Sequence, residues 1–181
     1  MLRTVGRLFI FVLLLCLPTL APAEGMDSAR TNVIKAGMVN GFTAYTTWPD
    51  AQSTEPFVIG VMGQDSNFIS ALKRFFKKKP IVGGRQLHIR PITLEQVLDC
   101  HVVVILGDAN KQAELILAKV AKLPILTISD REKFALSGGH VNFFSENNKL
   151  RFEINWQSTT QSNLKVSSRL LRLARVVGKP K

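Results

Sequence analysis

The residues that could do chemistry in this chain are three histidines, one internal cysteine and a few scattered carboxylates. His88, His101 and His140 each stand without a second His or Cys at metal-site spacing, so no metal is predicted. The stretch beginning at Ser137, Ser-Gly-Gly-His, lacks the strand-turn-helix context that exposes a nucleophilic serine. The acidic residues are too dispersed to predict a carboxylate pair for hydrolysis. No catalytic residue and no cofactor are therefore predicted, and a hydrolase is the least supported hypothesis.

Two further features could carry chemistry. Cys100 opens the apolar run Cys100–Leu106, which favours a core position, and disulfide-linked dimerisation would require it to be exposed. The Gly63–Ser66 turn joins an apolar strand to a helix N-terminus, as in phosphate sites. It matches only a fragment of the dinucleotide fingerprint, and no acidic residue ends the next strand. A small-ligand or anion-binding module using this turn is the alternative function.

The elements that must position these residues are organised around Ser137–Trp156, where period-two alternation predicts a β-hairpin with one apolar and one wet face. Gly138 and Gly139 give the backbone freedom just before its first arm. The apolar face is expected to hold Val141, Phe143, Leu150, Phe152 and Ile154. The wet face is expected to hold Asn142, Arg151, Glu153 and Asn155.

Strands and helices alternate along the rest of the chain. Apolar runs predict strands at Phe57–Met62, Gln86–Pro91, Val102–Leu106 (the central one) and Ile125–Ser129. Helical periodicity predicts helices at Ser28–Thr47, Thr93–Leu98, Ala109–Lys122, Ser129–Ala135 and Ser162–Val177. A further helix is expected to begin at Asp65 or Ser66 and to end before Lys77. Asp108 is the expected cap of the helix Ala109–Lys122. The aromatic side chains of Tyr45 and Trp48 are expected to be buried in the core. The fold class is α/β: a single-domain layered sandwich with a mainly parallel central sheet, a C-terminal antiparallel hairpin and helices on both faces.

The N-terminus has the features of a secretory signal peptide. Basic Arg3 and Arg7 precede the apolar run Leu8–Leu17, and Ala21-Pro22-Ala23 is a small-x-small cleavage site. The run is shorter than the roughly 20 residues that span a bilayer, and no later stretch could cross one. We expect residues 1–23 to be cleaved, residues 24–177 to form one domain and residues 178–181 to be a frayed tail. A periplasmic location is the simplest outcome.

The charge balance favours anionic partners. The chain has 24 Lys and Arg against 13 Asp and Glu, and without Arg3 and Arg7 the net charge is +9. Such an excess favours lipid headgroups and acidic protein surfaces. An exported protein rarely meets nucleic acid, so no nucleic-acid partner is predicted. The basic clusters at Lys73–Lys79 and Lys165–Lys181 are also explained as solvated helix faces and a tail.

Several segments together resemble the YfiR-like family of periplasmic regulators, from about Ala29 to Arg175. They are TTWP, FVIGVMG, GGRQLHIR, CHVVVIL, LPILTISD, FALSGGHVNFFSENNKLRFEINW and LKVSSRLLRLA, in this order behind a signal peptide. The resemblance implies an α/β protein that works by binding and has no catalytic residues. The best-understood members of that family repress a diguanylate cyclase of the inner membrane by engaging its periplasmic sensor domain, and their release raises cyclic di-GMP and favours biofilm. The sequence does not decide whether the chain forms a homodimer. The mature chain has a single cysteine, unlike relatives that sense redox state through disulfides.

The resemblance also suggests a partner-binding surface on the wet face of the hairpin and the exposed edge of the last helix. The candidates lie in the family-like motifs RFEIN and LKVSSRLL: Glu153, Asn155, Lys165, Ser167 and Arg169. An internal salt bridge between Glu153 and Arg169 or Arg172, fastening the last helix to the hairpin, is the alternative interpretation. Both interpretations stay open from the sequence.

Overall fold

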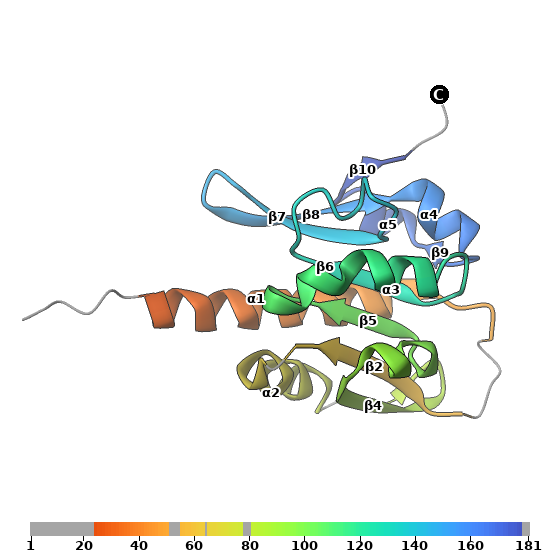
Figure 1. Cartoon of the computed structure of the whole chain (residues 1–181), viewed down its shortest axis with the longest axis horizontal. Helices are drawn as coiled ribbons and strands as arrows, with labels where there is room; N and C mark the ends of the chain where they lie inside the picture. Colours follow the sequence, from red (N-terminus) through yellow and green to blue (C-terminus); the bar gives the residue numbers. More distant parts are fainter. Residues whose placement is uncertain (1–23, 51–54, 64, 78–80, 179–181) are drawn as a thin grey trace, which may run out of the picture.

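A central β-sheet organises the structure, a computed structural model that describes residues 24–50, 55–63, 65–77 and 81–178. The expected signal peptide and all of the expected tail except Gly178 lie outside these residues. In the described part of the chain, eight strands pair in the order β10-β8-β7-β6-β5-β2-β4-β3 (Figure 1). Within this eight-stranded sheet of the described residues, only the β7–β8 and β3–β4 pairs are antiparallel, and β1 and β9 form a separate antiparallel pair. The predicted α/β class with a mainly parallel sheet and an antiparallel hairpin is confirmed.

The bounds of the elements are as follows. The strands are β1 Thr46–Thr47, β2 Phe57–Met62, β3 Ile81–Val82, β4 Arg85–Ile92, β5 Val102–Ile105, β6 Leu126–Ser129, β7 Val141–Glu146, β8 Lys149–Asn155, β9 Lys165–Val166 and β10 Arg175–Val177. The α-helices are α1 Glu24–Ala44, α2 Ser66–Phe76, α3 Ala113–Lys119, α4 Trp156–Gln161 and α5 Ser168–Leu171. Two 3₁₀ helices, η1 Leu94–Asp99 and η2 Gly107–Gln112, complete the described elements.

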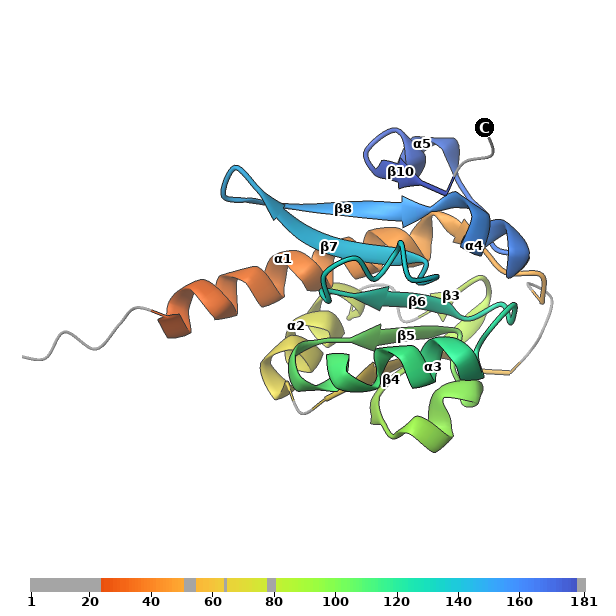
Figure 2. The same cartoon turned by 45° about the horizontal axis from the view of Figure 1, so that its top comes forward.

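Helices cover both faces of the sheet, as predicted (Figure 2). Alternate residues of β5 point to opposite faces: Val102 and Val104 join the core beneath α1 and α2, while Val103 and Ile105 join the core beneath α3 and η1. This strand is buried throughout and lies between β2 and β6. An all-apolar run is what a parallel strand covered on both sides requires.

The predicted hairpin is present, and its apolar face is the predicted one. Val141 lies opposite Ile154 and Phe143 opposite Phe152. These residues pack on α1, where the Phe42 ring lies 5.8 Å from Phe143 and 4.9 Å from Phe152 between centroids. The two-residue turn is Asn147–Asn148, with φ of 52° and 56°. Asparagine tolerates this left-handed backbone better than most residues, and two such residues match a type I′ hairpin turn.

The predicted C-terminal helix Ser162–Val177 is wrong. This segment holds β9, the one-turn helix α5 and β10 instead. Its β-branched residues are used in pairing: Val166 lies opposite Thr46 of β1, and Val176 lies beside Ile154 of β8. β-Branched side chains favour extended backbone, and the pairing satisfies edge groups of β1 and β8. The apolar spacing of the sequence imitated a helix because both strands are only two or three residues long.

Four local expectations also need correction. Ser28 lies inside α1 and so cannot cap it. The helix expected after Asp108 is split into η2 and α3, and α3 ends at Lys119. The segment 130–135 forms turns, because Ser129 Oγ accepts from the Arg131 N–H and Lys133 takes a φ of 60°. Tyr45 is exposed, although Trp48 is buried in the core as predicted.

Candidate functional site

The wet face predicted for the hairpin is buried except at Arg151. Asn142 is 2% exposed, and Glu153 and Asn155 are each 8% exposed. Strand β10 pairs with the outer side of β8, and segment 129–135 lies over this face. Neither neighbour is visible in the local alternation, because both reach the hairpin through long-range contacts. The period-two pattern therefore separated the apolar face from the polar face correctly, but the polar face is covered as well and is not exposed to solvent.

Two of the candidate residues hold the C-terminal segment together. Asn155 donates from Nδ2 to the Ala135 carbonyl at 2.7 Å, and its Oδ1 accepts from the Ser158 N–H at 2.9 Å, which caps α4. Ser167 caps α5 by accepting from the Leu170 N–H at 3.3 Å. The Ser167 N–H also donates to the Tyr45 carbonyl at 2.9 Å, next to the β1–β9 pair. Both side chains are engaged within the fold.

The other candidates separate into one buried carboxylate and two exposed cations. Glu153 lies in β8, level with Asn142 of β7 and Arg175 of β10. Among the described residues, no ion pair joins Glu153 to Arg169 or Arg172. The structure therefore does not contain the salt bridge that was the alternative interpretation of Glu153. Lys165 and Arg169 are exposed.

A short exposed surface remains, which we call the C-terminal basic segment: Lys165, Arg169, Arg172 and Leu173. Its three cations are exposed, and none of them makes an ion pair within the described residues. Leu173 is 71% exposed beside them. Exposed cations and an exposed aliphatic side chain in one short segment fit a partner surface that carries carboxylates and an apolar patch.

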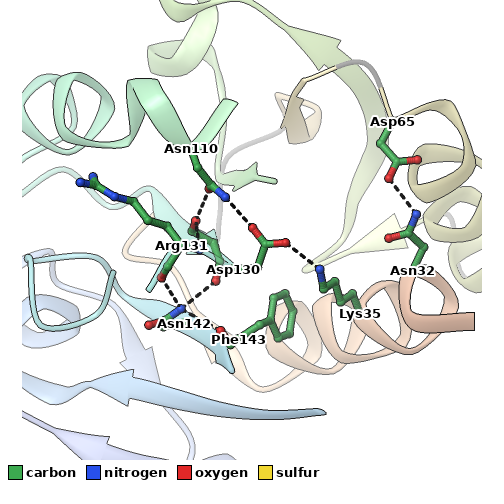
Figure 3. Close-up of polar contacts among 9 residues, drawn as sticks. Asn32, Lys35, Asp65, Asn110, Asp130, Arg131, Asn142 and Phe143 are labelled. Carbon is green, nitrogen blue, oxygen red and sulfur yellow. Dashed lines mark hydrogen bonds and ion pairs between the residues drawn. The ribbon is translucent and has the colours of Figure 1, made fainter. Parts of the chain in front are cut away.

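A polar network lies at the carboxyl ends of β2, β5 and β6 (Figure 3). Lys35 of α1 pairs with Asp130 at 2.7 Å, and Asn110 of η2 donates to the same carboxylate at 2.8 Å. Ser129 Oγ in turn donates to Asn110 at 2.8 Å. Asn142 Nδ2 donates to the carbonyls of Ser129 and Arg131. The network fixes α1 and η2 against the strand ends, and its side chains satisfy one another.

Sequence reasoning missed this network. Its one available signal was Asp130, which directly follows an apolar strand, because carboxyl ends of parallel strands meet at one edge. The same edge contains Gly63, Asp65 and Ser66 of the turn predicted as the alternative anion site, whose Gln64 lies outside the described residues. There the Asp65 carboxylate accepts from the Phe68 N–H at 2.9 Å and from Asn32 Nδ2 at 2.7 Å. A carboxylate of the chain thus already occupies the N-terminus of α2, which makes this turn unfavourable for an external anion.

The remaining candidates for chemistry have structural surroundings. Within the described residues, no group of three or more His, Cys, Asp or Glu side chains could hold a metal ion. Cys100 is buried, as predicted, and burial raises the pKa of its thiol to about 11. A thiol with so high a pKa is a poor nucleophile at neutral pH. In the described part of the chain, no helix is both long and apolar enough to cross a membrane.

Comparisons with known proteins define the class. A family model described as YfiR/HmsC-like matches residues 32–175. The chain therefore belongs to the YfiR/HmsC-like family, which confirms the resemblance predicted from its motifs. No curated protein gives a significant match. A crystal structure of a conserved domain protein from Vibrio cholerae O1 biovar El Tor strain N16961 is similar, with 14% identity and a TM-score of 0.46. The comparison covers 66% of this chain and 54% of that one, so this chain spans about half of that protein's length.

Proposed function

We propose that this chain is a periplasmic regulator that binds the periplasmic sensor domain of an inner-membrane diguanylate cyclase and represses cyclic di-GMP synthesis. The observation that carries the proposal is the YfiR/HmsC-like match over residues 32–175. In this role the chain acts by binding, without catalysis or a cofactor. Residues 1–23 serve as the export signal, cleavage follows Ala23, and residues 24–177 act as one domain.

The C-terminal basic segment is the surface that supports this proposal best. It retains Lys165 and Arg169 from the predicted set and adds Arg172 and Leu173. The other residues of that set, buried Glu153 and Asn155 and half-buried Ser167, are engaged within the fold, and Ser167 caps α5. An acidic partner surface would meet three cations that have no ion pair to break within the described residues. Association would then be faster and tighter at low salt.

Repression follows from differential affinity. A regulator changes the activity of its target only by binding one conformation of the target better than the other. A tenfold preference for the inactive sensor conformation corresponds to about 1.4 kcal/mol of bias, and a nearly complete switch needs a preference of roughly 10⁴-fold. The chain itself needs no conformational change in this scheme, because its role is to stabilise one state of the cyclase.

The direct test is calorimetric titration of the mature chain with purified periplasmic sensor domains of diguanylate cyclases from the same cell. We expect Lys165→Glu to weaken binding to the cognate domain about 5- to 30-fold, because it replaces attraction to an acidic surface by repulsion. The matched control is Lys73→Glu, an identical exchange at an exposed position on α2. It should leave the affinity within about twofold.

Raising the salt concentration should weaken wild-type binding more than binding of Lys165→Glu. Equal losses for Lys165→Glu and Lys73→Glu would show that net charge alone governs the association. Such a result would remove the C-terminal basic segment from the proposal. Absence of binding to every sensor domain would contradict the proposed partner class.

A further inference from the structure

A pocket of about 290 Å³ opens between the end of α1 and the turn that joins β3 to β4. The buried rings of Trp48, Phe57 and Phe76 form much of its wall. Its volume is near the lower end of the range for small-ligand sites, about 300–1,000 Å³. Aromatic walls of this size suit a molecule with one ring and a short side arm.

A buried arginine lies in the wall of this pocket. Arg85, at the start of β4, is 3% exposed, and its Nη1 donates to Asp50 Oδ2 at 2.8 Å. The guanidinium carbon lies 5.1 Å from the centroid of the Phe57 ring. The His101 ring stacks on the same phenyl ring at 4.6 Å. These contacts hold the guanidinium in a fixed orientation.

Asp50 and His101 both lie at the Nη1 nitrogen of Arg85. The Val58 N–H donates to His101 Nδ1 at 3.1 Å, so the proton of the neutral ring is on Nε2. That nitrogen lies 3.4 Å from Asp50 Oδ2, the oxygen that also accepts from Arg85 Nη1, and 3.0 Å from Arg85 Nη1 itself. Since Nε2 carries the proton, it donates to Asp50 and accepts nothing from Arg85. Burial and the charge of Arg85 lower the pKa of His101, which favours the neutral ring. The Nε–Nη2 edge of Arg85 makes no hydrogen bond within the described residues.

Two polar atoms of the pocket wall lack partners. Arg85 Nε and Thr46 Oγ1 are the buried side-chain nitrogen and oxygen atoms without a hydrogen-bond partner in the described part of the chain. They come from distant segments, yet both residues line this pocket. Thr43 lines it too, but its hydroxyl donates to the Val39 carbonyl at 2.9 Å. Buried polar groups without a partner are costly, and here both belong to residues that line one cavity.

We propose that this pocket binds a small carboxylic acid with an apolar single-ring body. The carboxylate accepts hydrogen bonds from the Nε–Nη2 edge of Arg85 and from the Thr46 hydroxyl. The ligand ring packs against the wall that Trp48 and Phe76 form, because the Trp48 and Phe57 rings already contact each other at 4.8 Å between centroids. A carboxylate matches the two parallel N–H groups of an arginine edge better than a neutral carbonyl does, because the hydrogen bonds are charge-assisted. This binding requires no cyclase and is independent of the proposed regulatory function.

The probe pair is phenylacetate and phenylacetamide, which share a ring and differ in charge. Each is titrated into the mature chain carrying Trp156→Phe, so that Trp48 reports binding by fluorescence, with calorimetry on the unmodified chain. We expect saturable phenylacetate binding that is at least about tenfold tighter than phenylacetamide binding. No saturable binding of either probe, or equal affinity for both, would overturn the proposal.

Threonine variants locate the site. Thr46→Val keeps the side-chain shape and removes the unpaired hydroxyl, so we expect about 3- to 10-fold weaker phenylacetate binding. The free Thr46→Val protein should melt no lower than wild type, because no internal hydrogen bond is lost. Thr160→Val, the same exchange at an exposed threonine of α4 outside the pocket, is the control and should leave the affinity within about twofold. Equal affinity for wild type and Thr46→Val would show that phenylacetate binds elsewhere and contradict the assignment.

Arg85→Gln gives the larger effect, with phenylacetate affinity reduced more than about 30-fold. Because this change also breaks the pair with Asp50, its fold is checked by circular dichroism. Thr46→Val decides the question if Arg85→Gln does not fold. Unchanged phenylacetate affinity in a folded Arg85→Gln variant would exclude the guanidinium as the anchor.

Discussion

His140 joins three segments of the C-terminal half through its ring. Its Nδ1 lies 3.1 Å from the Thr127 backbone nitrogen and 2.8 Å from Thr127 Oγ1, and its Nε2 lies 3.0 Å from Ser162 Oγ. The ring is 3% exposed. Burial lowers the pKa of this histidine from 6.5 to about 4, so the neutral ring is the form that the fold holds.

This histidine should make the fold sensitive to mild acid. The unfolded chain binds the proton from pH 6.5 downwards, whereas the folded chain binds it only near pH 4. Stability is therefore present above pH 6.5 and is lost as the pH falls towards 4, by about 2 kcal/mol between pH 7 and pH 5. Urea unfolding at the two pH values measures this loss.

The His140→Gln variant should be less stable at pH 7 but should lose less stability on going to pH 5. His88→Gln is the control, because His88 is exposed on β4, and it should keep the wild-type slope. A wild-type slope in His140→Gln would mean that other groups cause the acid sensitivity.

Two glycines test packing within single elements. A Cβ on Gly139, just before β7, would lie 2.2 Å from the ring of fully buried Phe134. We expect Gly139→Ala to destabilise the fold by about 2–3 kcal/mol through overpacking.

A Cβ on Gly41 of α1 would meet nothing within 4 Å. Gly41→Ala should stabilise by about 0.5–1 kcal/mol, because alanine loses less backbone freedom in a helix. Thermal unfolding of both variants is the measurement, and destabilisation by Gly41→Ala would contradict it.

Two substitutions in β8 distinguish a residue that stabilises the fold from a residue that could contact a partner. Glu153→Lys would place a cation in a buried position next to Arg175 of β10, so we expect a loss of about 1–3 kcal/mol in stability. Arg151→Glu reverses charge two residues earlier at an exposed position and should change stability by less than about 0.5 kcal/mol. Chemical denaturation gives both values. A Glu153→Lys protein of wild-type stability would return Glu153 to the set of candidate contact residues.

The elements that the sequence predicted well are those defined by local pattern. The bounds of β2 agree residue for residue, since an apolar run followed by glycine is read locally. The Asp65 cap and the hairpin faces follow from the same kind of signal. Strands β9 and β10 were missed because their partners, β1 and β8, are distant in sequence or separated by other elements. Burial of Glu153 and Asn155 was missed for the same reason.

Across the whole molecule, the proposed pocket and the C-terminal basic segment meet at the β1–β9 pair. Thr46 lines the pocket and lies opposite Val166, while Thr47 lies opposite Lys165. The two sites could not be related from the sequence, because Thr46, Arg85 and Lys165 come together only through the fold.

The most direct test of the proposed function is the cellular concentration of cyclic di-GMP with the gene deleted and then restored. Deletion should raise cyclic di-GMP, the full chain should reverse the rise, and a chain without residues 1–23 should not. The Lys73→Glu chain should restore repression, and the Lys165→Glu chain should restore it only partly. Unchanged cyclic di-GMP on deletion, or equal repression by the chain without residues 1–23, would contradict periplasmic repression of a cyclase.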